Sequence, residues 1–124
     1  MAKKYTDYEY WRAALNAGLC KFLILRSLVD KPLHGYEIIH RIDELTGRYY
    51  SPTEGAVYPI LHEFEACGCV KSRQEIARGR ERRVYALTRK GKDAVQAGAS
   101  VWQRAIPSIQ RVINQMIPPH TQRI

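Results

Sequence analysis

Hydrophobic residues recur every three or four positions through the first third of the chain, the spacing of one helix face. Asp7 supplies a capping side chain for a short amphipathic helix, which is predicted over residues 7–17. The apolar stripe of this helix is Tyr8, Trp11 and Leu15. Gly18 permits a break between this helix and the next one. Residues 19–29 are apolar on most sides, which predicts a second helix at the centre of the core.

Two further helices are predicted in the middle of the chain. The first covers about residues 35–46, and Gly47 is well placed to end it. The second has the clearest start in the sequence, because Ser51 to Glu54 has the pattern of a capping box. Ser51 is the expected cap, Pro52 stands where a missing N–H costs nothing, and Glu54 can bond back to the cap.

The capped helix separates an apolar face from a polar face. Its apolar positions are Val57, Ile60, Leu61 and Phe64, and its polar face carries Thr53, Glu54, Tyr58, His62 and Glu65. Pro59 removes the hydrogen bond to the Gly55 carbonyl, so a local bend is expected. Two strands follow, over residues 70–76 and 83–87. The polar segment between them is longer than a two-residue turn, which predicts a flexible, protruding hairpin.

A long last helix is predicted from about residue 89 to residue 116, capped by Thr88 and bent at Pro107. Its apolar seam repeats at alternating spacings of four and three, as in a coiled coil: Gly91, Val95, Gly98, Trp102, Ala105, Ile109, Val112 and Met116. So long a helix cannot lie wholly on so small a core. A second copy of the chain is the simplest partner for its far end.

The order of elements predicts a mainly α (α+β) fold, a winged helix-turn-helix with an N-terminal helix and a long C-terminal dimerisation helix. We divide the chain into an N-terminal arm and helix (1–17), the winged domain (18–88), the dimerisation helix (89–117) and a disordered tail (118–124). The 124 residues, 45% hydrophobic and 26% charged, suit one soluble domain. The longest uncharged apolar stretch, 22–25, is too short to span a bilayer, and no secretory signal is evident, so a cytoplasmic protein is expected.

Positive charge is concentrated in one segment. The whole chain carries a net charge of +8, and residues 71–92 hold nine basic and two acidic residues, which gives +7. Such a patch attracts a polyanion, although a charged run alone is more often a solvated surface. Here the basic segment follows a capped helix with a polar face, and this combination favours double-stranded DNA as the partner. The tip arginines Arg78, Arg80 and Arg82 are expected to contact phosphates or enter a narrow minor groove.

The expected DNA-contacting residues on the helices are Ser51, Thr53, Glu54, Gly55, Tyr58 and His62, with Tyr36 at the start of the preceding helix. For Tyr58 and His62 the alternative is a solvated helix face. Tyr36 fits packing between helices equally well, and Pro59 serves only to shape its helix. Arg83 has the alternative of pairing with Glu75 across the hairpin.

The sequence gives little support for catalysis or for metal binding. Cys20, Cys67 and Cys69 have no spacing that completes a metal site, and the four histidines suggest no dyad. Glycine-rich phosphate loops and nucleophile elbows are missing from the sequence. No cofactor is expected, and the protein is not expected to be an enzyme. A winged module that binds protein rather than DNA is the second functional class.

The chain resembles the PadR family of bacterial transcription regulators in three separated motifs. These are residues 34–38 (HGYEI), 55–62 (GAVYPILH) and 68–70 (GCV), continuing through 79–91 (GRERRVYALTRKG). The similarity covers roughly residues 18–95, and the single C-terminal helix resembles the smaller branch of the family. The Cys67-Gly68-Cys69 segment departs from the commoner pattern and leaves a redox role open.

The resemblance implies a homodimer built by the last helix, with the N-terminal helix, through Leu15, packing on the partner. It implies repression from a palindromic operator, relieved in some members by a small aromatic compound. In small drug-sensing members a tryptophan on the last helix lines a pocket at the dimer centre. Trp102 stands at that position here, with Trp11 as a second candidate, while filling of the dimer core is the alternative role for Trp102.

Overall fold

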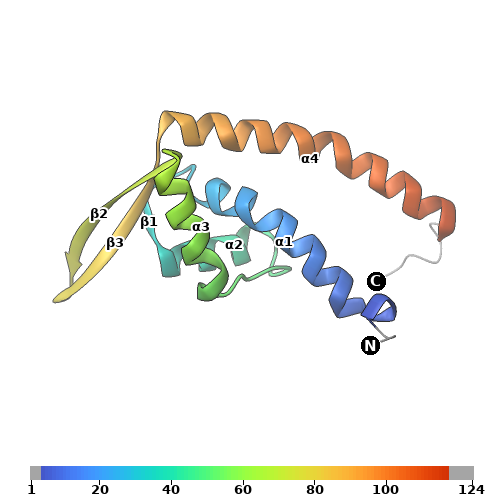
Figure 1. Cartoon of the computed structure of the whole chain (residues 1–124), viewed down its shortest axis with the longest axis horizontal. Helices are drawn as coiled ribbons and strands as arrows, with labels where there is room; N and C mark the ends of the chain where they lie inside the picture. The colour runs from blue at the N-terminus through green and yellow to red at the C-terminus, as the bar shows by residue number, and fades with distance from the viewer. Residues whose placement is uncertain (1–3, 118–124) are drawn as a thin grey trace.

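The computed structural model describes residues 4–117 and shows a mainly helical protein with one small antiparallel sheet (Figure 1). The sheet has the strand order β1-β3-β2, and β2 with β3 forms the wing. This architecture confirms the predicted winged helix-turn-helix. In chain order the elements are η1 (Lys4–Thr6), α1 (Tyr8–Ser27), β1 (Leu33–His34), α2 (Gly35–Leu45), α3 (Glu54–Ala66), β2 (Val70–Ala77), β3 (Arg80–Leu87) and α4 (Arg89–Met116).

Helices α1, α2 and α3 pack around one hydrophobic core. Its completely buried aliphatic side chains are Ile24, Ile38, Ile42, Val57 and Leu61. Full burial of each such side chain contributes about 1.5–3 kcal/mol to folding. Tyr85 of β3 is also in this core, which fixes the wing against the helices.

Helix α1 runs without interruption from Tyr8 to Ser27, so the predicted break at Gly18 is wrong. A single glycine in a helix interior costs only about 1 kcal/mol relative to alanine. Asn16 and Cys20, buried four residues apart on one face, anchor the helix on both sides of that glycine. The predicted boundary between residues 17 and 18 therefore falls inside a single helix.

Helix α3 is capped by Thr53 and not, as predicted, by Ser51. The Thr53 hydroxyl accepts a hydrogen bond of 3.2 Å from the backbone N–H of Ala56. Pro52 is buried, which holds it and Ser51 in the connection that precedes the helix. Glu54 is consequently the first helical residue, and it does not complete a capping box.

The wing is a tight hairpin, which corrects the predicted long polar connection over residues 77–82. Strands β2 and β3 pair from Val70 opposite Leu87 to Ala77 opposite Arg80. Only Arg78 and Gly79 lie between them, with φ angles of 55° and 76°. Two central residues with positive φ are typical of a type I′ turn, whose twist matches the flanking strands. The ladder therefore extends almost to the tip.

Strand β1 was not predicted, because its two residues are too short to show a pattern. Leu33 pairs with Tyr85, and His34 pairs with Val84, so β1 adds to the free edge of β3. This pairing brings the beginning of α2 against the base of the wing (Figure 1).

Helix α4 has two halves with different surroundings. In the first half, an added Cβ at Gly91 would overlap the Cys69 carbonyl oxygen, and Val95 is part of the core. Gly98 lies against the Phe22 ring of α1. Val95 and Gly98, predicted to contact a partner, therefore pack on their own chain.

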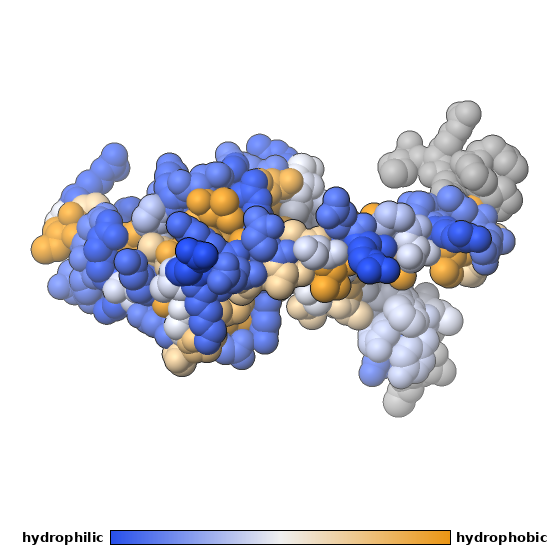
Figure 2. Space-filling model, turned by 90° about the horizontal axis from the view of Figure 1, so that it is seen from above, coloured by the Kyte–Doolittle hydropathy of each residue, from blue (hydrophilic) through white to orange (hydrophobic). Residues whose placement is uncertain are grey.

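The second half of α4 extends away from the body and curves toward its end (Figure 1). Hydrophobic side chains appear at intervals along this narrow part of the molecule (Figure 2). The exposed ones are Val101, Ile106, Ile109, Val112, Ile113 and Met116. The predicted disordered tail, 118–124, lies outside the described residues.

Candidate nucleic-acid interface

A groove of about 490 Å³ lies between the beginning of α2, the exposed side of α3 and the strand β3. Four of the residues predicted to contact DNA line it: Tyr36, Tyr58, Arg80 and Arg82. They come from three elements and are up to 46 residues apart in sequence, between Tyr36 and Arg82. The groove therefore combines aromatic hydroxyl groups with guanidinium groups. Both kinds of group form hydrogen bonds with the phosphates and sugars of DNA.

His34 organises the start of α2 and was missed as a site residue. Its backbone N–H donates to the Glu37 carboxylate at 3.1 Å, and its Nδ1 faces the Glu37 backbone N–H at 3.4 Å. This reciprocal pattern is a capping box with histidine at the cap. The spacing of a polar residue three positions before a glutamate was the available sequence signal.

The same histidine contacts the wing. The Arg82 guanidinium lies 3.0 Å from His34 Nε2, across a separation of 48 residues. Arg82 is half-buried on β3 and not at the hairpin tip, so its predicted place at the tip is wrong. The contact joins β3, at the residue paired with Glu75, to the N-terminus of α2 and limits the freedom of Arg82.

The Tyr58 side chain lies in space that is free because residue 35 is a glycine. An added Cβ at Gly35 would overlap the Tyr58 hydroxyl and ring. Tyr58 is half-buried, with its ring packed on the core and its hydroxyl near the groove. Tyr36 is exposed, and its ring meets the His40 ring edge-on at a centroid distance of 4.6 Å.

The remaining residues predicted to contact DNA lie just before α3 and on its exposed side. Thr53, Glu54, Gly55 and His62 are exposed. The first-turn N–H groups of a helix have no intrahelical partner and favour an anion, which suits a phosphate near residues 54–55. Ser51 is exposed as well. It lines a different cavity beside α1 together with Thr53, and none of these five residues lines the groove.

The wing arginines differ in what they contact. Arg78 and Arg80 are exposed, and neither guanidinium bonds to another residue within 4–117. Arg73 pairs with Glu75 at 2.9 Å, while Arg83 donates to the Ser72 hydroxyl at 2.9 Å. The alternative pairing of Arg83 with Glu75 is therefore wrong. Arg78 and Arg80 are the wing cations best placed to bind a phosphate.

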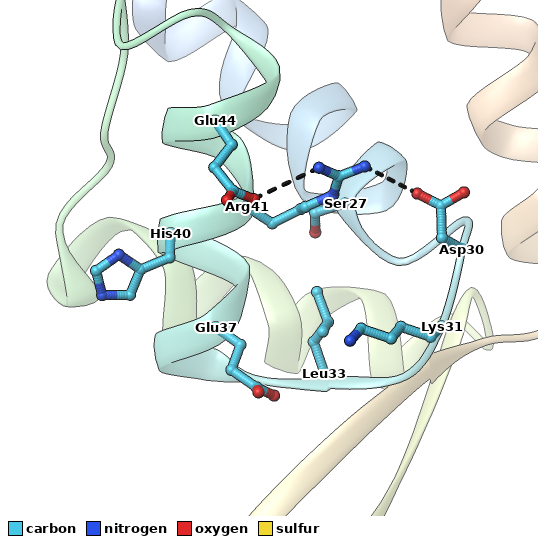
Figure 3. A pocket seen from close by; sticks show the side chains of 8 residues that line it. All are labelled: Ser27, Asp30, Lys31, Leu33, Glu37, His40, Arg41 and Glu44. Atoms are coloured by element: carbon cyan, nitrogen blue, oxygen red, sulfur yellow. Dashed lines mark hydrogen bonds and ion pairs between the residues drawn. The ribbon is translucent and has the colours of Figure 1, made fainter.

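Another hollow, on the other side of α2, is lined by ion-paired side chains (Figure 3). Arg41 reaches Asp30 at 3.0 Å on one side and Glu44 at 3.5 Å on the other. The hydrogen bond from Arg41 lowers the pKa of the Asp30 carboxyl below its usual value. The cluster ties the segment after α1 to α2. Arg26 also pairs with Asp30, at 3.6 Å, so two arginines face two carboxylates and the role of the cluster is structural.

The two tryptophans lie in separate places. Trp102 lines a shallow, mostly apolar hollow of about 180 Å³ with Leu15 of α1 and Ile109 of α4. The Trp11 indole N–H donates to the Tyr5 carbonyl at 2.9 Å. Trp11 lines a different hollow, which also includes Leu15, so within residues 4–117 of one chain the two indoles line separate hollows. In residues 4–117, no helix is both long and apolar enough to cross a membrane, and no cluster of metal-ligating side chains occurs.

Comparison with known proteins gives consistent matches. Residues 24–97 match the model of the "Transcriptional regulator PadR-like family". The chain is 36% identical over 87 residues to the transcriptional regulator Rv3488 of Mycobacterium tuberculosis, which covers 70% of this chain and 74% of that protein. It is also 34% identical over 58 residues to the Escherichia coli transcriptional regulator YqjI, covering 47% of this chain and 28% of that one.

Solved structures of PadR regulators also match this chain. A PadR family transcription regulator from Clostridium difficile aligns with a TM-score of 0.63 and 30% identity, over 79% of this chain and 97% of that chain. Bacillus subtilis PadR in complex with operator DNA aligns with a TM-score of 0.59 and 28% identity, over 65% and 45% of the two chains.

Proposed function

The chain belongs to the PadR-like family of transcriptional regulators, and from that membership we propose that it binds double-stranded DNA sequence-specifically as a homodimer. The family consists of regulators and not of enzymes. Bacillus subtilis PadR, a structural relative, is known in complex with operator DNA. A regulator of this kind acts on DNA in the cytoplasm, which is where we place this protein.

One observation carries the proposal: Tyr36, Tyr58 and Arg80 line one groove beside α3. Phosphate contacts fix a protein on the duplex, and base contacts in the grooves read the sequence. We assign the phosphate contacts to Arg78, Arg80 and the first turn of α3. The exposed side chains of Thr53 and His62, with the Tyr58 hydroxyl, are assigned to the major groove.

The exposed seam of α4 supports the homodimer. Ile109, Val112 and Met116 continue the spacing that Gly91 and Val95 begin, yet all three are exposed in the single chain. Trp11 and Leu15 of α1 are exposed as well. A second copy that covers these residues would hold two α3 helices at a fixed separation, for half-sites about 34 Å apart on a palindrome.

Repression relieved by a small aromatic effector completes the proposal. A dimeric protein seated on a promoter excludes other proteins from that DNA, which supports repression. The Trp102 hollow is mostly apolar and lies on the proposed dimer face, where a second copy would deepen it. We assign effector contacts there to Trp102, with Trp11 contributing from α1 of the partner.

Selection of bound fragments from genomic DNA tests the DNA-binding proposal. The expected result is enrichment of fragments that share a palindrome with half-sites about one helical turn apart. Footprinting on such a fragment is expected to show two protected half-sites. Recovery of fragments without a shared sequence would contradict sequence-specific binding, and recovery of none would favour the protein-binding alternative.

A further inference from the structure

Two cysteines lie together where α3 ends and the wing begins. The backbone N–H of Cys69 donates to the Phe64 carbonyl at 2.8 Å, and that of Gly68 donates to the Glu65 carbonyl at 3.2 Å. Gly68 has a φ of 86°, so this is the Schellman pattern, in which a glycine turns the chain back at a helix end. Cys67 and Cys69 stand on either side of the glycine, and their sulfur atoms are 3.6 Å apart.

The backbone of this turn is tied to the start of α4. The Lys90 ammonium donates to the Cys67 carbonyl at 2.6 Å, and the Thr88 hydroxyl donates to the Gly68 carbonyl at 2.5 Å. The Thr88 backbone N–H donates to the Cys69 carbonyl at 3.1 Å. The end of α3, the start of β2 and the start of α4 therefore meet at one corner of the molecule (Figure 1).

The two thiols of this corner differ in their access to solvent. Cys67 is exposed, whereas Cys69 is buried. Burial, followed by the hydrogen bond with Cys67, raises the pKa of Cys69. An oxidant in solution can therefore reach Cys67 first, with Cys69 beside it as a second thiol that keeps its proton. An accessible cysteine next to a resolving cysteine is the usual arrangement of a redox-sensing site.

We propose that Cys67 and Cys69 form a redox site that a hydroperoxide converts into an intramolecular disulfide. With hydrogen peroxide, the Cys67 thiolate attacks one oxygen atom, the O–O bond breaks and hydroxide leaves, so that Cys67 becomes a sulfenic acid. Cys69 Sγ then attacks Cys67 Sγ and the S–O bond breaks. The Cys69 proton leaves with the hydroxyl group as water. The two sulfur atoms together lose two electrons, which reduce the peroxide.

The disulfide would join the end of α3 to the residue before the wing. Its formation brings the sulfur atoms from 3.6 Å to about 2 Å, so the turn at Gly68 must adjust. That turn connects the helix to which base reading is assigned with β2 of the wing, so oxidation is expected to weaken operator binding. This consequence rests on the proposed DNA-binding function, whereas formation of the disulfide does not.

Peptide mapping of the whole protein after treatment with hydrogen peroxide tests the proposal without DNA. Free thiols are blocked with iodoacetamide in urea, and the protein is then digested with trypsin. Cleavage after Arg48 and Lys71 releases residues 49–71, which include Cys67 and Cys69 but not Cys20. This peptide is expected to escape alkylation and to be lighter by two hydrogen atoms. Dithiothreitol added before blocking is expected to restore two alkylated cysteines.

Cys20→Ser is the matched control, because Cys20 is buried in the core, and this variant should form the same disulfide. In Cys69→Ser the second step is impossible, so dimedone, which traps sulfenic acids, is expected to label Cys67. Alkylation of both cysteines after peroxide treatment would overturn the proposal. So would oxidation of Cys67 to a sulfinic acid without a disulfide, or a disulfide between two chains on a non-reducing gel.

Anisotropy of a labelled operator fragment tests the consequence for DNA binding separately. The oxidised protein is expected to lose affinity, and dithiothreitol is expected to restore it. Equal affinity of the two forms would rule out redox control of DNA binding and leave the disulfide standing. No DNA binding by the reduced protein would contradict the proposed function instead.

Discussion

Tyr58 occupies the space that any side chain at Gly35 would need, because an added Cβ there overlaps the tyrosine hydroxyl and ring. Gly35 begins α2, and Tyr58 lies in the first half of α3. The two helices of the DNA-binding motif are thus fitted together by one glycine and one tyrosine. This close approach also decides where the Tyr58 hydroxyl lies in the groove.

Gly35→Ala is expected to destabilise the protein by about 1–3 kcal/mol, the usual cost of overpacking. Urea denaturation followed by circular dichroism measures this change. The double variant Gly35→Ala/Tyr58→Ala provides the control. In the Tyr58→Ala background the same substitution should cost little, because the overlapping ring is gone. An equal cost in both backgrounds would show that Tyr58 is not the neighbour that matters.

Arg80→Ala is expected to weaken binding to every DNA sequence and to reduce the salt dependence by about one unit of slope per protomer. The reason is that Arg80 is exposed and has no protein partner within residues 4–117. Fluorescence anisotropy at several salt concentrations measures both effects. Arg73→Ala is the matched control on the same hairpin. Its charge is already balanced by Glu75, so a smaller loss is expected. The assignment fails if the two variants behave alike.

Ile109→Asp is expected to give monomers and to abolish operator binding. Ile109 is exposed on the seam of α4, and a carboxylate buried there between two copies would be unpaired. Analytical ultracentrifugation reads the oligomeric state. Ser100→Asp adds the same charge on the opposite face of α4, where Ser100 bonds only to the Gln96 carbonyl among the residues that the structure describes. That variant should remain dimeric. A dimeric Ile109→Asp protein would rule out the proposed interface.

The three thiols are expected to react at different rates. Cys67 is exposed, whereas Cys20 and Cys69 are buried. Burial, with the Cys67 thiol 3.6 Å away, raises the pKa of Cys69, so less of it is thiolate at a given pH. A colorimetric disulfide reagent at pH 8 should label Cys67 first, and labelling of Cys69 should become faster only at higher pH. Cys67→Ser should remove the fast phase; an unchanged fast phase would contradict this order.

Local signals predicted much of the fold. Thr88 caps α4 as predicted, because a threonine before a long periodic run is a short-range pattern. The order of α2, α3, β2, β3 and α4 was predicted for the same reason. The break at Gly18 and the cap at Ser51 were wrong, since burial of Asn16, Cys20 and Pro52 by other parts of the chain decides both. Propensity and spacing do not contain that information.

The site was harder to predict than the fold. Arg78 takes a positive φ in the hairpin turn without the usual asparagine or aspartate, so the tight turn gave no signal. The contact of Arg82 with His34 joins residues 48 apart and depends on the unpredicted strand β1. The basic wing and the polar face of α3 were predicted, because composition and helical spacing are sufficient to indicate them.

The salt dependence of DNA binding by the unmodified protein tests the central claim most directly. If both protomers place Arg78 and Arg80 on phosphates, at least four contacts form, and log Kobs should fall against log salt with a slope of about −3.6 or steeper. Anisotropy of a labelled operator fragment between low and moderate salt gives this slope. A steep slope with two protomers bound per fragment is the expected result. Binding that barely responds to salt, or that is saturated by one protomer, would contradict the account.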